Sequence, residues 1–275
     1  MDVVAPTHVF YHGNCWDGFG AAWAVWKKYG DAPKYQGVNY GDSVPDLPPD
    51  ARVAILDFSW PRAALTEIRG HVENLLVLDH HKTAEADLKD CEFAVFDMEK
   101  SGATLTWGHY HDTDPPWMLR YVEDRDLWRF ALPKSREVAS AMRSYPKDFQ
   151  VWDKLHLDVA GLKREGVTTL RLTSMMASDM AKAARWMTVG GEFVPVANAT
   201  VFYSEVGEAL CEMHPGIPFA AYYMDRADGM RQWGLRTKKD DVDVSEIAKK
   251  YGGGGHRAAA GFVQPSPVAL REDAS

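Results

Sequence analysis

A carboxylate and two imidazoles, Asp79, His80 and His81, follow directly after the aliphatic run 75–78. Four consecutive aliphatic residues are typical of a strand that is buried on both faces of a parallel sheet. Ligands of open α/β sheets bind just beyond the carboxyl ends of such strands. A single Asp at this point also serves as the cap of a following helix, but packing alone does not explain two adjacent His residues. The triplet therefore predicts a position where chemistry takes place.

Two earlier strand ends carry the same kinds of side chain. The aliphatic run 53–56 ends at Asp57, and a predicted strand at 8–12 ends at His12. Asp17 follows in a tight segment and begins a helix, whose apolar residues recur at helical spacing. A helix N-terminus favours anions and metal-bound phosphates, although an ordinary strand-to-helix turn is an alternative interpretation. If the strands are neighbours, their ends converge on one crevice.

The segments between these strands indicate how they are arranged. A fourth strand is predicted at 93–96, and helices are expected to begin near Ser59 and Ser101. The segment 31–50 is rich in Pro, Gly and Asp, so we expect it to be mostly loop. Strands that alternate with short helices are typical of a doubly wound parallel sheet. We therefore predict an α/β catalytic domain over residues 1–135.

The second half of the chain has a different pattern. Apolar residues at helical spacing predict a helical connector over 136–190. Beyond it, a smaller α/β domain is predicted over 191–264, followed by a loosely attached tail at 265–275. Its short strands are expected at 193–196, 200–203, 219–223 and 232–235. Its helices are expected near 205–213 and 244–251.

A run of four glycines, 252–255, is the most specific feature of the smaller domain. A polar, flexible linker is one interpretation of such a run. This run follows a predicted helix and precedes small apolar residues at helical spacing, which favours a tight backbone cradle. The exposed amides of Gly253, Gly254 and Gly255, with His256 and Arg257, would suit a phosphate or a nucleotide. Arg236 in the preceding strand would add positive charge.

Composition and charge restrict the class of protein. The 275-residue chain has a net charge of −8, which disfavours binding long nucleic acid through its phosphates. Three distant cysteines, Cys15, Cys91 and Cys211, argue against a disulfide framework and against a zinc site built on thiolates. Because the sequence has neither a bilayer-spanning apolar run nor a signal-peptide pattern, we expect a soluble, cytoplasmic protein with no membrane partner.

The motifs together resemble the DHH phosphoesterase family with its DHH-associated C-terminal domain. The resemblance covers residues 8–262 and rests on these motifs: His12-x-Asn14-x-x-Asp17-Gly18, Asp57, Asp79-His80-His81, the acidic stretch 124–126 and the glycine run with His256. The family implies a two-domain enzyme with a centre of two divalent metals, usually Mn²⁺, on the larger domain. It also implies that the smaller domain holds the phosphate or base of the substrate across a cleft.

The resemblance implies roles for individual residues. The residues that match metal ligands are His12, Asp17, Asp57, His80 and Asp124. Asp57 matches the carboxylate shared by both metals, and His81 matches the imidazole that contacts the scissile phosphate. The glycines, His256, Arg257 and Arg236 match the substrate-binding part of the family's smaller domain.

Three further residues are expected to contact the metal ligands rather than the metals themselves: Asn14, Asp79 and Asp126. Asn14 stands where many relatives carry Asp, and the neutral amide would weaken one metal position. Asp124 is preferred to Asp126 as a ligand because the segment 128–130 after it resembles the family's aromatic-basic-aromatic segment.

From this resemblance we predict a hydrolase, a phosphodiesterase that converts short oligonucleotides or linear dinucleotides to mononucleotides, with Asp57 and His81 as catalytic residues. Carboxylate and imidazole ligands suit two Mn²⁺ ions, with Mg²⁺ or Co²⁺ as alternatives. Two other hypotheses stay open. One is a phosphatase or phosphodiesterase acting on a bisphosphate nucleotide, a cyclic nucleotide or pyrophosphate; the other is a nucleotide-binding module without catalysis. Family members often dimerise, so a homodimer is an alternative to the monomer.

Overall fold

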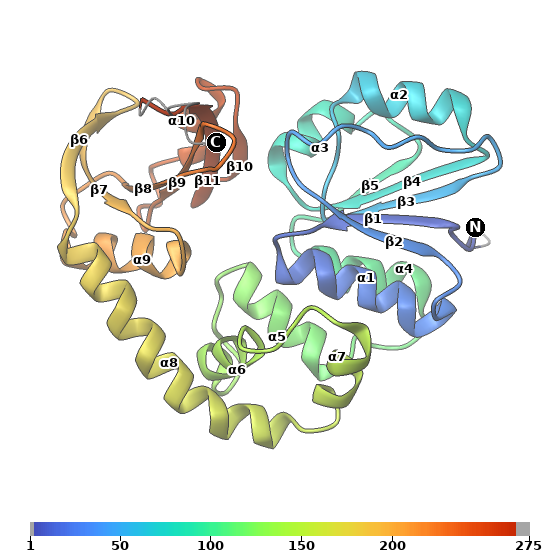
Figure 1. The fold of residues 1–275 in the computed structure, drawn as a ribbon, viewed down its shortest axis with the longest axis horizontal. Helices are drawn as coiled ribbons and strands as arrows, with labels where there is room; N and C mark the ends of the chain where they lie inside the picture. Colours follow the sequence, from blue (N-terminus) through green and yellow to red (C-terminus); the bar gives the residue numbers. More distant parts are fainter. Residues whose placement is uncertain (1–2, 268–275) are drawn as a thin grey trace, which may run out of the picture. The chain divides into compact units, whose positions relative to one another are not determined.

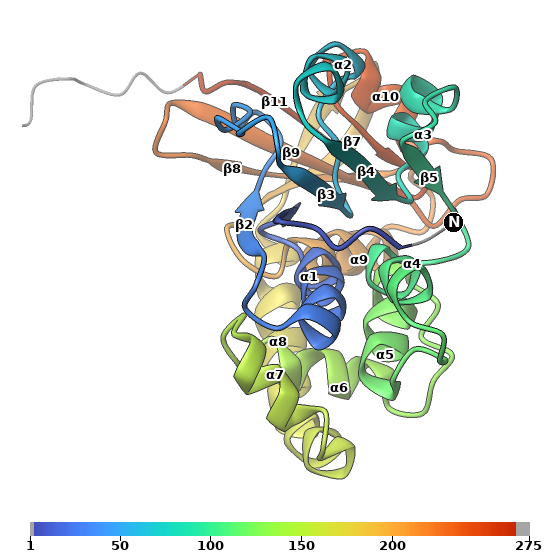
Figure 2. The same cartoon turned by 90° about the vertical axis from the view of Figure 1, so that its right-hand side faces the viewer.

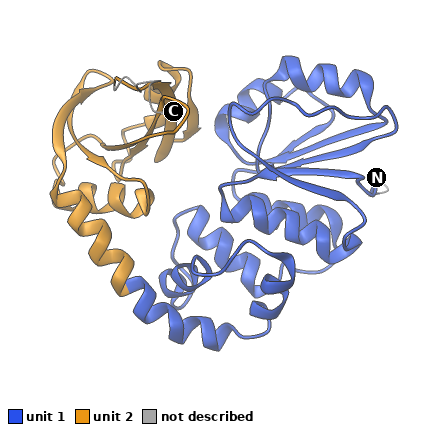
Figure 3. Ribbon diagram, in the orientation of Figure 1, with its two compact units in different colours: residues 1–170 blue, residues 171–275 orange. Residues whose placement is uncertain are grey.

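The structure is a computed structural model that describes residues 3–267. The chain divides into two compact units, residues 1–170 and 171–275 (Figure 3). The division falls inside the long helix α8 (Val159–Lys182). Part of the predicted tail, residues 268–275, lies outside the described residues.

The first unit is built on a parallel sheet with strand order β2-β1-β3-β4-β5 (Figure 1). The strands are β1 (His8–His12), β2 (Lys34–Val38), β3 (Arg52–Leu56), β4 (Asn74–Asp79) and β5 (Ala94–Phe96). Helices α1 (Trp16–Tyr29) and α4 (Gly102–Tyr110) cover one face, and α2 (Arg62–His71) and α3 (Lys82–Leu88) cover the other (Figures 1 and 2). The predicted doubly wound α/β fold is confirmed.

Alternation along β3 explains why the strand sequences are almost continuously apolar. Ala54 and Leu56 pack with residues of α1 and α4, whereas Val53 and Ile55 pack with residues of α2 and α3. A strand covered by helices on both faces must be apolar at every position.

Strand β2 differs from the prediction of a loop over 31–50. It forms the edge of the sheet and pairs with β1 alone among the described strands. Its sequence, Lys-Tyr-Gln-Gly-Val, is largely exposed, so it lacks the aliphatic run that marked the central strands. Backbone pairing rather than side-chain burial makes this segment a strand.

The three helices that follow α4 belong to the core of the first unit. They are α5 (Trp117–Asp126), α6 (Ser135–Met142) and α7 (Phe149–Leu155). Val138, Met142 and Trp152 pack with Phe19 and Trp23 of α1. Much of the segment predicted to be a connector therefore supports the helix that begins beside Asp17, and its C-terminal end forms strand β6 (Arg185–Val189) instead of a helix.

The second unit contains a mixed sheet with strand order β10-β11-β9-β8-β7-β6 within its described residues. The remaining strands are β7 (Glu192–Asn198), β8 (Ala220–Asp225), β9 (Met230–Arg236), β10 (Gly254–His256) and β11 (Ala259–Pro265). Helices α9 (Tyr203–Met213) and α10 (Val244–Lys249) complete the unit, which confirms a smaller α/β domain. The predicted strand at 200–203 is wrong, because the chain turns there into α9.

The glycine run lies in a tight β-hairpin, and the residues after it form β11 rather than a helix. A Cβ at Gly253 would lie 2.1 Å from the Gly261 carbonyl oxygen, and Gly255 has φ +138°. Close backbone packing therefore accounts for these glycines. Arg257 next to them donates hydrogen bonds to the carbonyl oxygens of Lys239 and Val242, at 2.8 and 3.2 Å.

Candidate metal centre

The register of the parallel sheet brings three chemically active residues into one row. Tyr11 of β1 pairs with Leu56 of β3, and Leu56 pairs with Leu78 of β4. The next residues along these three segments are His12, Asp57 and Asp79. In a sheet of order 2-1-3-4-5, the winding direction reverses between β1 and β3, and this reversal opens a ligand crevice at the carboxyl ends of the strands.

Asp57 lies at the centre of this row. Its side chain is 1% exposed, with one carboxylate oxygen 3.0 Å from His80 Nε2 and the other 3.7 Å from His12 Nδ1. Its backbone has φ +56°, a left-handed conformation that costs a non-glycine residue about 1–3 kcal/mol. The backbone N–H of Asp57 donates to the Leu78 carbonyl at 2.9 Å, so the neighbouring strand holds this unusual turn.

Asp17 is held by the N-terminus of α4. Its two carboxylate oxygens accept hydrogen bonds from the backbone N–H groups of Gly102 and Ala103, at 2.5 and 3.0 Å. One of these oxygens also lies 3.5 Å from His80 Nε2. Gly102 is required for this approach, because a Cβ there would lie 2.5 Å from the Asp57 Cβ and 3.0 Å from Asp17 Oδ2.

Asp79 orients the second histidine of the motif. Its Oδ1 accepts hydrogen bonds from the backbone N–H groups of His80 and His81, at 2.7 and 3.3 Å. The same oxygen lies 2.7 Å from Nδ1 of His81, which places the Nδ1 proton toward Asp79. Since α3 begins directly after His81, Asp79 fixes both the turn and the direction of the imidazole.

Buried acids give this region an unbalanced negative charge. Burial raises the pKa of Asp17 well above its usual value, and the charges of Asp57 and Asp126 raise it further. Burial also raises the pKa of Asp126. Although burial alone would raise the pKa of Asp57, the imidazoles of His12 and His80 lower it. A bound cation would relieve this repulsion.

The acidic neighbours raise the pKa values of the two histidines His80 and His81. Burial alone would lower the pKa of His80, but its hydrogen bond to Asp57 and the charge of Asp126 raise that pKa well above the usual value. Burial would likewise lower the pKa of His81, and the charge of Asp79 raises it. A proton on either imidazole would balance part of the acidic charge in the absence of a cation.

The donor atoms fit divalent cations. Within the described residues of the first unit, three sets of side chains each bring their donor atoms within 4.8 Å of one another: His12 with Cys15 and Asp57, Asp17 with His80 and Asp126, and Asp57 with Asp79 and His81. Among the described residues, Asp57 Oδ2, Asp79 Oδ2 and His12 Nδ1 are buried and accept or donate no hydrogen bond. Buried oxygen and imidazole donors of this kind match first-row divalent metals.

In the structure, the two aspartates of the acidic stretch 124–126 have different contacts. Asp126 Oδ2 lies 3.6 Å from His80 Nε2 and joins the set that contains Asp17. Asp124, preferred from the sequence, has its two carboxylate oxygens on the backbone N–H groups of Ala131 and Leu132, at 2.9 and 3.1 Å. Asp124 therefore holds the loop after α5, whereas Asp126 reaches the predicted ligands.

Other predicted residues lie elsewhere. The side chain of Asn14 is exposed. Arg236 is buried on β9, and His256 on β10 is half-buried, so both belong to the second unit. Cys15, for which no ligand role was predicted, lies with His12 and Asp57; its place two residues before Asp17 was the available signal.

An aromatic side chain borders the cluster. The ring of Tyr40 is centred 5.5 Å from that of His12, 5.0 Å from that of Phe58 and 6.5 Å from that of His81. Tyr40 is 51% exposed within the described structure. An exposed aromatic ring offers a surface on which a base can stack.

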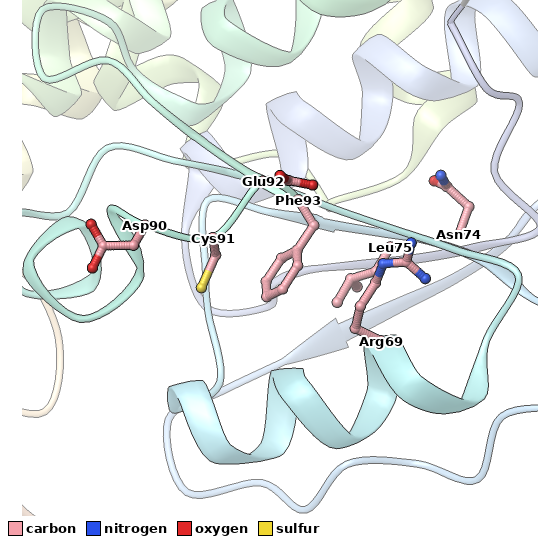
Figure 4. Close-up of a pocket in the computed structure, with 7 residues that line it drawn as sticks. All are labelled: Arg69, Asn74, Leu75, Asp90, Cys91, Glu92 and Phe93. Carbon is pink, nitrogen blue, oxygen red and sulfur yellow. The ribbon is translucent and has the colours of Figure 1, made fainter.

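A surface pocket of about 460 Å³ lies away from this cluster. Figure 4 shows its lining residues, Arg69, Asn74, Leu75, Asp90, Cys91, Glu92 and Phe93. Asn74 begins β4, whereas Asp79 ends it, so the pocket is at the opposite end of the strand. We therefore place the candidate site at the carboxyl ends of the strands.

Comparison with known proteins found no family model that matches the chain. The uncharacterized protein R106 of Acanthamoeba polyphaga mimivirus is 29% identical over 92% of this chain, which spans 66% of that protein's length. Oligoribonuclease NrnB of Bacillus subtilis is 40% identical over 68 residues, 25% of this chain and 16% of NrnB.

A solved structure shares the fold. The pGpG-specific phosphodiesterase PggH of Vibrio cholerae has a TM-score of 0.51 at 15% sequence identity, and the match covers 94% of this chain and 92% of PggH. The likeness shows the fold alone, and it agrees with the predicted α/β fold class. No helix in the described residues is long and apolar enough to cross a membrane.

Gly102→Ala is expected to weaken Mn²⁺ binding by roughly tenfold or more, the loss typical when groups that support metal ligands are disturbed. The added methyl group would displace the carboxylates of Asp17 and Asp57. Gly108→Ala is the matched control on the same helix, because a Cβ there meets nothing within 4 Å. Isothermal titration calorimetry on both folded variants checks the prediction, and equal affinities for the two would contradict it.

Replacing Asp124 and Asp126, one at a time, by asparagine should separate their roles. Asp124→Asn is expected to lower the free energy of unfolding by about 1–3 kcal/mol, because one carboxylate oxygen that accepts a backbone N–H is replaced by an NH₂ donor. Asp126→Asn should instead reduce Mn²⁺ affinity and leave stability near that of the wild type. Denaturant unfolding and metal titration measure the two effects. The reverse pattern would restore Asp124 as the ligand.

Proposed function

We propose that this protein is a metal-dependent phosphodiesterase that hydrolyses short oligonucleotides or linear dinucleotides to mononucleotides. The observation that carries the proposal is the approach of His12 and His80 to the buried carboxylate of Asp57, with Asp17 and Asp126 beside the same His80 nitrogen. Oxygen and imidazole donors from several strand ends suit two divalent cations. We expect Mn²⁺ as the preferred ion, with Mg²⁺ and Co²⁺ as alternatives.

The proposed ligands are His12, Asp17, Asp57, His80 and Asp126, with Asp57 shared between two positions. When bound, a pair of divalent cations supplies an acidified water and neutralises phosphoryl charge. Asp57 suits a shared role because its two oxygens face different imidazoles, those of His12 and His80.

His81 is the proposed contact for the scissile phosphate. Asp79 accepts a hydrogen bond from the Nδ1–H group, which turns the opposite edge of the ring away from Asp79. The raised pKa of His81, caused by the charge of Asp79 acting against burial, favours an imidazolium that donates a hydrogen bond to an anionic oxygen. In this role His81 stabilises charge that develops on the phosphoryl group.

Two features favour a substrate that carries a base. The exposed ring of Tyr40 next to His12 and His81 can stack on a nucleobase, whereas pyrophosphate offers nothing to stack. The chain is similar in sequence, over 25% of its length, to an oligoribonuclease, and similar in fold to a pGpG-specific phosphodiesterase. Substrate contacts of Arg236, His256 and Gly253–Gly255 in the second unit stay predictions. Arg257 is left out, because its guanidinium holds backbone carbonyls.

Incubation of the purified protein with Mn²⁺ and a panel of substrates tests the proposal. The linear dinucleotide pApA should be converted to AMP faster than pAp, pyrophosphate or cyclic dinucleotides are hydrolysed. Asp57→Asn should lower turnover at least 100-fold with an unchanged circular dichroism spectrum, because the shared ligand loses its charge. Preferential hydrolysis of pAp or pyrophosphate would favour the phosphatase hypothesis. Inactivity on every linear substrate from two to five nucleotides would refute the proposal.

A further inference from the structure

The sulfur of Cys15 lies close to the donor atoms of two proposed metal ligands, His12 and Asp57. Donor atoms of Cys15, His12 and Asp57 lie within 4.8 Å of one another. Cys15 immediately precedes α1 in extended conformation, and its Sγ accepts a hydrogen bond from the backbone N–H of Asp17 at 3.3 Å. The sulfur therefore lies between the end of β1 and the start of α1.

The carboxylate facing this sulfur provides an independent observation. Asp57 is 1% exposed, and its Oδ2 lies 3.7 Å from His12 Nδ1. Within residues 3–267, neither of these two buried atoms forms a hydrogen bond. Their separation of 3.7 Å is longer than a normal hydrogen bond, and a donor atom of each residue lies within 4.8 Å of the Cys15 sulfur. A cation beside Cys15 would satisfy both.

The turn that carries Cys15 is anchored. Lys147, in the segment between α6 and α7, donates a hydrogen bond to the Gly13 carbonyl oxygen at 2.7 Å. Its ammonium group also lies 5.3 Å from the centre of the Trp16 ring. Lys147 therefore contacts residues before and after Cys15 in the sequence, and these contacts hold the turn that carries the sulfur.

A role as helix cap does not by itself explain a cysteine here. The residues preferred at this position are Asn, Asp, Ser, Thr and Gly, and sulfur is a weak acceptor. Serine would cap α1 at least as well. Burial and the charges of Asp57 and Asp126 raise the pKa of the Cys15 thiol, but a thiol, unlike a serine hydroxyl, is deprotonated when it binds a soft or borderline metal.

We propose that the thiolate of Cys15 ligates a divalent cation together with His12 and Asp57. On ligation the S–H bond breaks, its proton passes to solvent and the sulfur electron pair forms the bond to the metal. The inference rests on the proposed cation site and adds to it. The two proposed cation positions then differ in their donor atoms. The position beside His12 has sulfur, nitrogen and oxygen donors and favours Zn²⁺ or Co²⁺, whereas the position beside Asp17 has oxygen and nitrogen donors alone.

Titration of the full chain with Co²⁺ tests this assignment. Wild-type protein should develop a sulfur-to-cobalt charge-transfer band in the near ultraviolet, together with visible d–d absorption. Cys15→Ser should lose the charge-transfer band, retain Co²⁺ binding at the remaining donors and bind Zn²⁺ roughly tenfold or more weakly. Cys91→Ser is the matched control, since Cys91 is a half-buried free thiol elsewhere in the first unit and should keep the band.

The outcomes separate the two proposals. A charge-transfer band that survives in Cys15→Ser, or Co²⁺ binding to the wild type without such a band, overturns the role of Cys15 and leaves the cation site intact. Absence of any Co²⁺ absorption in the folded wild-type protein overturns both. Thermal unfolding of Cys15→Ser should match the wild type in the absence of metal, because serine preserves the cap.

Discussion

The buried carboxylate of Asp57 is the constraint on which the site depends. Burial of an ionised group is unfavourable unless opposite charge or hydrogen bonds accompany it. Two imidazoles, His12 and His80, approach Asp57 from neighbouring strand ends, but Asp17 and Asp126 add further negative charge. The arrangement is consistent with a protein that completes its charge balance by binding cations.

Local strain supports the same interpretation. Asp57 adopts a left-handed backbone conformation, which a β-strand end would avoid if an ordinary turn were sufficient. Gly102 admits no side chain because the Asp57 and Asp17 side chains lie against it. The sheet and the N-terminus of α4 therefore hold two acids closer than their charges favour, at a cost in stability that is typical of functional sites.

The central part of the fold could be predicted from the sequence because burial leaves a strong pattern. The runs that end at Asp57 and Asp79 are apolar at successive positions, since helices cover both faces of the sheet. Strand β2 left no such pattern, because an edge strand is specified by backbone pairing. The glycine run was open to two interpretations, and the choice depended on Gly261, a partner that follows it across a hairpin.

The site was predictable as far as strand ends specify it. His12, Asp57 and Asp79 follow from register alone. The choice between Asp124 and Asp126 did not, because it depends on which acid turns toward the amides of Ala131 and Leu132. The position of Cys15 beside His12 and Asp57 was not predicted for a related reason: cysteine spacing indicates sites made of several thiolates, but not a single sulfur beside an oxygen and an imidazole.

Anomalous diffraction from crystals of the full chain soaked in Mn²⁺ tests the central claim most directly. The account predicts two anomalous peaks at the manganese edge, both within bonding distance of the Asp57 carboxylate. One peak should adjoin His12, and the other should adjoin His80 and Asp17. Ordered Asp57, His12 and His80 side chains with no anomalous density among them would contradict the account.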